Sequence, residues 1–317
     1  MSSGRPILLD TDVGSDVDDA LALGVIFAER EALDLVAVTT VGRRGAVRAR
    51  AAASLLGLAG HRGVETCIGA EAPLLRKASH FNWFGHEERC VADAPLAPIS
   101  EEPAAERIVR AAREHPGLEV VAIGPMTNLA RAIALDPELP NRLGGVTIMG
   151  GHIREVRVGS FECPAGIDYN LCSDPEATLA VLGAGCVTTL VPADVTLRVW
   201  LRDADVAALR GGSDLQRELA RQVDIWKPVQ HRIFTALGGD LASDNAAFLH
   251  DPLSVLALVD ASSLVFEELR VVPTLEGGVL RTLEAPAGTG LGARMRVATG
   301  VTPARAGAAI AERLCCL

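Results

Sequence analysis

The chain has no apolar run near the roughly 18 residues that a membrane-spanning helix needs, so no membrane partner is expected. Its first ten residues lack the long apolar segment and small-residue cleavage site of a secretory signal peptide. The seven cysteines form no CxxC pair, which favours free thiols in a reducing compartment. These absences predict a cytoplasmic protein.

The chain also lacks an excess of positive charge. It carries 30 Lys and Arg against 40 Asp and Glu, a formal net charge of −10. Such an acidic balance repels polyanions, so a nucleic-acid polymer is not expected as a partner. A small neutral ligand remains compatible with this charge.

The composition is that of an ordinary globular protein, with 49% hydrophobic and 22% charged residues among 317. No internal repeat, low-complexity tract or linker interrupts it. A chain of this length can bury a core without disulfides or a structural metal. We therefore expect one domain over residues 1–317.

Short apolar strands alternate with helical segments through the first two thirds of the chain. This alternation predicts a doubly wound, mainly parallel, Rossmann-like α/β sheet with helices on both faces. Beyond residue 195 the pattern is mainly helical, with two late strands before a terminal helix. The expected strands are 7–9, 35–41, 118–123, 146–149, 187–191, 264–272 and 294–298, and the expected helices are 18–29, 47–58, 101–115, from 127, 173–183, 215–237, from 251 and from 302.

Ligands of such folds bind beyond the carboxyl ends of the parallel strands. The loops that follow Leu9, Val41, Ile123 and Met149 should therefore line one edge of the sheet and form the active site.

The loop after the first strand is exceptionally acidic. The segment DTDVGSDVDDA, at residues 10–20, carries five carboxylates, on Asp10, Asp12, Asp16, Asp18 and Asp19. A helix N-terminus accommodates one or two carboxylates, but not a pair at the end of a buried strand. Closely packed like charges repel one another unless water or a cation compensates them. Carboxylate oxygens suit Ca²⁺ or Mg²⁺, so we expect a metal site, with a solvated acidic loop as the alternative.

This segment resembles the signature of the inosine-uridine-preferring nucleoside hydrolase family, DxDPGxDDA, with Val13 in place of proline and two extra residues before Asp18. Three further stretches resemble the family in the same order along residues 6–260. They are VAIGPMTNLA at 121–130, IMGG at 148–151 and HDP at 250–252. The resemblance implies a hydrolase that cleaves the N-glycosidic bond of ribonucleosides to free base and ribose, in nucleoside catabolism or salvage.

Carried over position by position, the resemblance implies a Ca²⁺ ion, with Mg²⁺ as the second choice. Asp12 would deprotonate the attacking water, Asp18 would accept a hydrogen bond from the ribose 2′-hydroxyl, and His250 would protonate the leaving base. The implied metal ligands are Asp12, Asp19, the Ile123 carbonyl and Asp251, with Asp16 as a further candidate. Asp168, Asn170 and Asp251 would contact the ribose hydroxyls, and the family suggests a homodimer or homotetramer.

Several positions depart from the family pattern. Arg43 stands where many members have asparagine, and the family's AEFN is IDYN at 167–170, so a glutamate becomes Asp168. The stretch FGHE at 84–87 only loosely resembles a family loop. Candidates for the base pocket, with core packing or surface placement as the alternative, are Trp83, Trp226, His231 and Arg232.

Two other functions remain open at this point. A haloacid-dehalogenase-type phosphatase would use Asp10 as a nucleophile, because a strand followed by DTDV resembles its start. It would also need a lysine, and the chain has only Lys77 and Lys227. A ribose- or nucleoside-binding protein without turnover is the other alternative.

Overall fold

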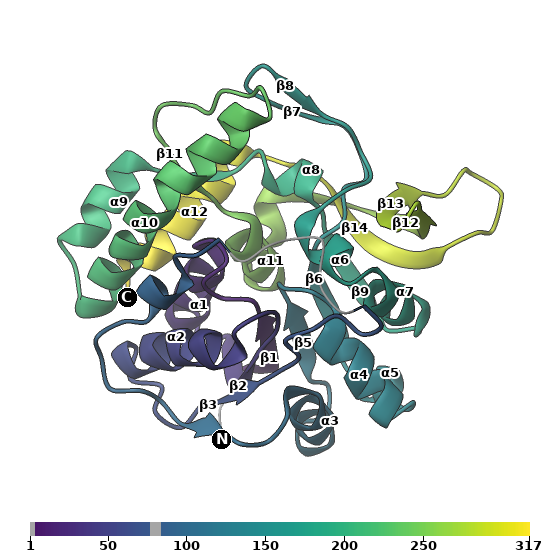
Figure 1. The fold of residues 1–317 in the computed structure, drawn as a ribbon, viewed down its shortest axis with the longest axis horizontal. Coiled ribbons are helices and arrows are strands. Elements are labelled where there is room, and N and C mark those ends of the chain that lie inside the picture. The colour runs from purple at the N-terminus through teal and green to yellow at the C-terminus, as the bar shows by residue number, and fades with distance from the viewer. Residues whose placement is uncertain (1–3, 77–83) are drawn as a thin grey trace.

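A ten-stranded sheet forms the centre of the computed structural model, which describes residues 4–76 and 84–317 (Figure 1). Its strands are β1 (Arg5–Thr11), β2 (Leu33–Thr40), β3 (Glu65–Ile68), β4 (Ile99–Ser100), β5 (Glu119–Ala122), β6 (Gly145–Met149), β9 (Thr188–Val191), β12 (Leu264–Glu276), β13 (Val279–Glu284) and β14 (Ala293–Val301). They lie in the order β13-β12-β14-β9-β6-β5-β1-β2-β3-β4. All neighbours from β14 to β4 pair in parallel, whereas β12 is antiparallel to both β13 and β14.

The strand β1 shows why this sheet is buried on both faces. Ile7 and Leu9 point into one hydrophobic core and Leu8 into the other, because successive side chains of a strand alternate between faces. A strand that is covered on both sides has a continuous run of apolar residues, and the sequence of β1 has such a run at residues 7–9.

Helices cover both faces of the sheet (Figure 1). The core that contains Ile7 is covered by α1 (Asp18–Ala28), α2 (Gly45–Leu58), α9 (Asp203–Arg210), α10 (Asp214–Ala236), α11 (His250–Val259) and α12 (Pro303–Cys315). The core that contains Leu8 is covered by α3 (Ala104–Glu114), α4 (Thr127–Leu135), α5 (Leu139–Arg142) and α7 (Pro175–Gly183). The predicted doubly wound α/β fold is therefore confirmed.

The remaining elements are short. Two-stranded ribbons are formed by β7 (Val156–Val158) with β8 (Phe161–Cys163), and by β10 (Trp200–Arg202) with β11 (Asn245–Phe248). The other short helices are α6 (Tyr169–Ser173), α8 (Ala193–Thr196), η1 (Glu87–Cys90) and η2 (Ala261–Ser263). No helix in the described part of the chain is both long enough and apolar enough to cross a membrane.

The expectation of a mainly helical region beyond residue 195 was incomplete. It missed β10, β11 and β13, and β12 is longer than expected. The strand β13 pairs with β12 across a turn at Gly277 and Gly278, both with positive φ. A Gly-Gly pair between apolar segments is a hairpin signal, so the sequence contained evidence for this strand.

The order of the strands reverses at β1. The chain builds outward through β2, β3 and β4 on one side of β1, and through β5, β6 and β9 on the other. Crossover connections on opposite sides leave a crevice beyond the carboxyl ends of the two central strands, where ligands of this architecture bind. Asp12, after β1, and Pro125, after β5, line the same pocket.

Candidate active site

The acidic segment forms the connection between β1 and α1. Asp12 follows the end of the strand, Asp16 lies in the loop, and Asp18 and Asp19 occupy the first turn of the helix. A helix N-terminus carries a partial positive charge, which favours carboxylates at the last two positions. This local electrostatic preference explains why α1 begins at Asp18 although no side chain caps it.

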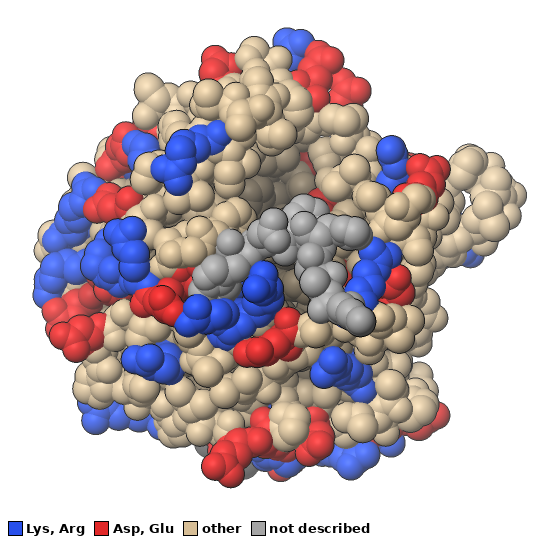
Figure 2. Space-filling view, viewed as in Figure 1, with Lys and Arg blue, Asp and Glu red and all other residues tan. Residues whose placement is uncertain are grey.

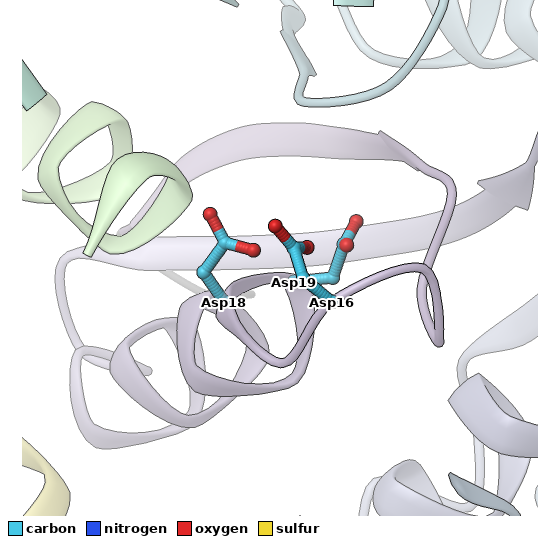
Figure 3. A group of neighbouring side chains, drawn as sticks. All are labelled: Asp16, Asp18 and Asp19. Carbon is cyan, nitrogen blue, oxygen red and sulfur yellow. The ribbon is translucent and has the colours of Figure 1, made fainter. Parts of the chain in front are cut away.

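Three carboxylates of this segment converge. One oxygen from each of Asp16, Asp18 and Asp19 lies within 4.8 Å of the other two, and Figure 3 shows the three side chains projecting together from the start of α1. Asp18 and Asp19 are buried, and Asp16 is partly exposed. Their spacing fits oxygen ligands around one hard cation.

Asp251 reaches the same place from a distant part of the chain. It lies in the first turn of α11, and its backbone N–H donates to Asp18 Oδ2 at 3.2 Å. Its buried side chain is close enough to Asp19 and Asp16 for their charges to raise its pKa, after burial as the main cause. The packing of α1 against α11 brings together two acidic residues that are 233 positions apart.

Asp12 is buried beside this group. Its Oδ2 accepts a hydrogen bond from the Ser15 hydroxyl at 2.7 Å, which fixes the orientation of the carboxylate. Burial raises the pKa of Asp12, and the positive charge of Arg48 opposes that rise. Sequence reasoning did not single out Ser15 or Arg48, and a serine three residues after Asp12 within a Gly-containing turn was the available signal for the first.

The pKa values of the acidic group are raised throughout. Burial is the largest cause for Asp16, Asp18 and Asp19, and the repulsion of neighbouring carboxylates adds to it. Removing charged groups from water and placing like charges together both favour protonation. A bound cation would reverse this preference and keep the carboxylates ionised.

Three buried carboxylate oxygens find no hydrogen-bond partner among the residues that the structure describes. They are Asp10 Oδ2, Asp18 Oδ1 and Asp168 Oδ1. The other oxygen of Asp10 accepts hydrogen bonds from Thr39 Oγ1 at 2.6 Å and from Asn128 Nδ2 at 2.8 Å. Burial raises the pKa of Asp10 to about 7. Unsatisfied buried oxygens are uncommon in proteins, and an ion or ligand is one explanation for them.

Ile123 and Asn170 meet at the end of β5. Asn170 Nδ2 donates to the carbonyl oxygen of Ile123 at 2.8 Å and to that of Met149 at 3.1 Å. A carbonyl oxygen has a second lone pair, so this contact leaves Ile123 able to ligate a cation. The structure thus places Asn170 against the carbonyl that the family resemblance implies as a ligand.

Asp168 begins α6 as its N-cap. Its Oδ2 accepts the backbone N–H of Leu171 at 2.9 Å, whereas Oδ1 has no hydrogen-bond partner among the described residues. Burial raises the pKa of Asp168 to about 6. One oxygen of this shorter side chain is therefore committed to the helix, and the other is available to a ligand.

His250 opens α11 immediately before Asp251. Its Nδ1 forms a hydrogen bond with the Thr196 hydroxyl at 2.6 Å, and its ring lies 5.4 Å from that of Phe248. Burial lowers the pKa of His250 to about 4, so the free imidazole is neutral near pH 7. If the Thr196 hydroxyl donates to Nδ1, the imidazole proton lies on Nε2.

A pocket opens beside Asp12. Its lining includes Arg43, Pro125, Thr127 and Tyr169. Figure 2 shows one face of the molecule, which is hollowed above the grey residues and carries Lys, Arg, Asp and Glu side chains around its rim.

The predicted base-pocket residues have different environments. Trp226 is buried, with its ring 5.4 Å from Phe84 and 5.6 Å from His86, and Phe84 lies 6.3 Å from Tyr169. His231 contacts the Asn245 carbonyl through Nε2 at 3.0 Å, and Arg232 is exposed. Trp83 lies outside the described residues.

The sequence profile of the inosine-uridine preferring nucleoside hydrolases matches residues 7–307, and the chain belongs to that family. It is therefore an N-glycosyl hydrolase that acts on ribonucleosides.

Similarity to individual proteins extends over most of the chain. It is 28% identical over 264 residues to uridine nucleosidase 1 of Arabidopsis thaliana, covering 80% of this chain and 73% of that one. It is also 28% identical over 286 residues to the inosine-uridine preferring nucleoside hydrolase of Crithidia fasciculata, covering 86% and 84%. The structure of a purine-preferring ribonucleoside hydrolase from Gardnerella vaginalis superposes with a TM-score of 0.82 at 25% identity, covering 98% of each chain.

Proposed function

We propose that this enzyme is a calcium-dependent ribonucleoside hydrolase whose ion is held at the crevice beyond β1 and β5. The observation that supports this most directly is the convergence of carboxylates from the β1–α1 loop and from α11. The donors are hard oxygens, which Ca²⁺ takes in sets of six to eight. Asp12, Asp19, Asp251 and the Ile123 carbonyl would hold the ion, with Asp16 as a further ligand.

The unsatisfied oxygen of Asp18 and the raised pKa values across the group fit this assignment, because both would be relieved by a cation. Mg²⁺ is the second choice, since it demands a stricter octahedral arrangement. When bound, the ion would lower the pKa of the attacking water and orient the vicinal hydroxyls of the ribose.

Asp12 is proposed as the general base. A base must lie within hydrogen-bond reach of the water that it deprotonates and must keep a fixed orientation. The Ser15 hydroxyl holds one oxygen of Asp12 and leaves the other for that proton. The charge of Arg48 favours the ionised form that a base requires.

The remaining polar residues would bind the sugar. Cleavage of the C1′–N bond builds positive charge on the ribose ring, which nearby carboxylates stabilise. Asp18 and Asp251 would accept hydrogen bonds from the ring hydroxyls, and Asp168 and Asn170 would also contact hydroxyls of the ribose. Placing acceptors around the ring orients it and lowers the energy of the charged transition state.

The activity is tested by incubating the full chain with inosine, uridine and other ribonucleosides and measuring free base and ribose. We expect stoichiometric release of both, and much slower release from 2′-deoxyribonucleosides, which lack one of the hydroxyls that Asp18 and the ion would hold. Saturable binding of nucleosides without release of base would instead establish a binding protein.

The phosphatase alternative has little support in the structure. Asp10 is fully buried and engaged by Thr39 and Asn128, which is a poor arrangement for a nucleophile. Lys227 forms an ion pair with Asp203 on α9, and Lys77 lies outside the described residues. Release of phosphate, but not base, from nucleoside monophosphates would revive this alternative.

His250 is proposed to assist departure of the base by donating the Nε2 proton of its neutral imidazole, since burial lowers the pKa of His250 to about 4. His250→Ala should lower turnover of inosine by about 10²-fold, at the lower end of the effect of general acids. An activated aryl riboside, whose leaving group needs no proton, should be affected far less. His115→Ala, at the end of α3 and the opposite edge of the sheet, is the matched control. Equal losses on both substrates would show that His250 does not act on the leaving group.

The state of the cysteines bears on the compartment in which the protein works. Cys67, Cys90, Cys163, Cys172 and Cys186 are buried and unpaired, while Cys315 and Cys316 are exposed. Free thiols suit the reducing cytoplasm. We propose a cytoplasmic homodimer or homotetramer that serves purine or pyrimidine salvage.

A further inference from the structure

A buried arginine lies directly behind the acidic loop. Arg48, on α2, has only 3% of its surface exposed. Its Nη1 donates to the carbonyl oxygens of Asp12 and of Val13, the latter at 3.1 Å. Its Nε donates to the carbonyl of Arg43 at 2.9 Å. One guanidinium thus connects the loop after β1 with the loop after β2.

Such burial of a positive charge requires compensation. Of the Arg and Lys side chains in residues 4–76 and 84–317, only Arg48 and Arg107 are buried. Arg107 lies on α3, and its guanidinium is within ion-pair distance of Glu65 and Glu114. Removing an ion from water is costly unless opposite charges and hydrogen bonds offset the loss. At Arg48 the compensating charge is the aspartate cluster itself.

The guanidinium lies directly against the acidic loop. Its hydrogen bonds to the carbonyls of Asp12 and Val13 hold the positive charge beside this segment, and Arg48 lines the same pocket as Asp12. An arginine cannot lose its proton in a protein, so this positive charge is permanent.

We propose that Arg48 is a built-in counter-cation of the aspartate cluster, which partly neutralises it and holds its loop in place when no metal is bound. This inference rests on the proposed calcium site, because Arg48 and the calcium ion would both neutralise the charge of the aspartate cluster. The three hydrogen bonds from the guanidinium to the backbone carbonyls of Asp12, Val13 and Arg43 engage no carboxylate oxygen. The carboxylates therefore remain available as ligands.

Removing the charge of Arg48 should change the stabilisation by calcium, which the loss of a purely structural arginine would not do. Without Arg48, the metal-free protein must accommodate the repulsion among the carboxylates alone, and a calcium ion then relieves more of it. The stabilisation by calcium should therefore increase when the charge is removed. Loss of a structural contact would instead lower stability equally with and without the ion.

The experiment compares the Tm of the full chain in EDTA and in saturating calcium chloride for four proteins. In Arg48→Met we expect the rise in Tm caused by calcium to exceed that of the wild type by about 4 °C or more. Arg48→Lys, which keeps the charge, should show the wild-type rise. Arg107→Met, which removes an equally buried arginine far from the cluster, should lose stability but keep the wild-type rise.

A rise in Arg48→Met equal to or below that of the wild type overturns the proposal, as does an increased rise in Arg107→Met. Folding of Arg48→Met only in calcium supports it. If that variant folds in neither buffer, Arg48→Gln, which is also uncharged, replaces it with the same expectation. Absence of any rise in the wild type would refute the calcium site, and the counter-cation role with it.

Discussion

Asp12→Asn is expected to lower turnover of ribonucleosides by at least about 10²-fold, the scale seen when a group that acts in the transition state is removed. Asparagine keeps the shape of the side chain, and its carbonyl oxygen can still accept the hydrogen bond from Ser15. It cannot accept the proton of the attacking water. Initial rates of base release at saturating inosine or uridine measure the effect.

The control for this variant is Asp34→Asn, at the amino end of β2 and the opposite edge of the sheet. It makes the same chemical change away from the site and should leave turnover near that of the wild type. Circular dichroism and Tm should show that both variants fold. Wild-type turnover in a well-folded Asp12→Asn protein would exclude Asp12 as the base.

Removal of calcium is expected to lower turnover of ribonucleosides at least as much as Asp12→Asn does. Dialysis against a chelator should reduce turnover by more than about 10²-fold, because the attacking water and the ribose diol both lose their binding partner. Readdition of calcium should restore activity. Magnesium should restore less, since a flexible set of carboxylates suits the larger ion better.

The same treatment should lower thermal stability. Calcium at about 100 times its dissociation constant stabilises the folded chain by about 2.7 kcal/mol. For a chain of this size, its loss corresponds to a fall in Tm of about 4 °C. Full activity and unchanged Tm after exhaustive chelation would contradict a catalytic calcium ion.

Much of the fold could be predicted because its signals are local. The apolar run at the start of the chain and the acidic helix start that follows it led to β1 and α1 within a few residues. Strand–helix alternation then implied the parallel sheet, because parallel neighbours need a crossover connection. The strands that sequence reasoning missed are each short or lie in a hairpin, where the alternation is weak; they are β3, β4, β7, β8, β10, β11 and β13.

The site was predictable only in part. Asp12, Asp18 and Asp19 stand in one motif, and their proximity follows from the sequence. The carboxylates that converge in the structure, however, are those of Asp16, Asp18 and Asp19. The sequence indicated Asp16 only as a further candidate metal ligand, and Asp18 as a residue that binds the ribose 2′-hydroxyl. The two residues inserted before Asp18 change the loop geometry, and a motif cannot specify how an inserted loop folds.

The amino-acid sequence by itself determined the family, the α/β class and the chemical nature of the site, because these depend on residue types at short spacing. Only the tertiary structure brought Asp251 against Asp18 and placed the guanidinium of Arg48 behind the acidic loop. The physical reason is that helix packing sets such contacts. The packing of α11 against α1, and of α2 beside the sheet, depends on the whole core and not on any local pattern.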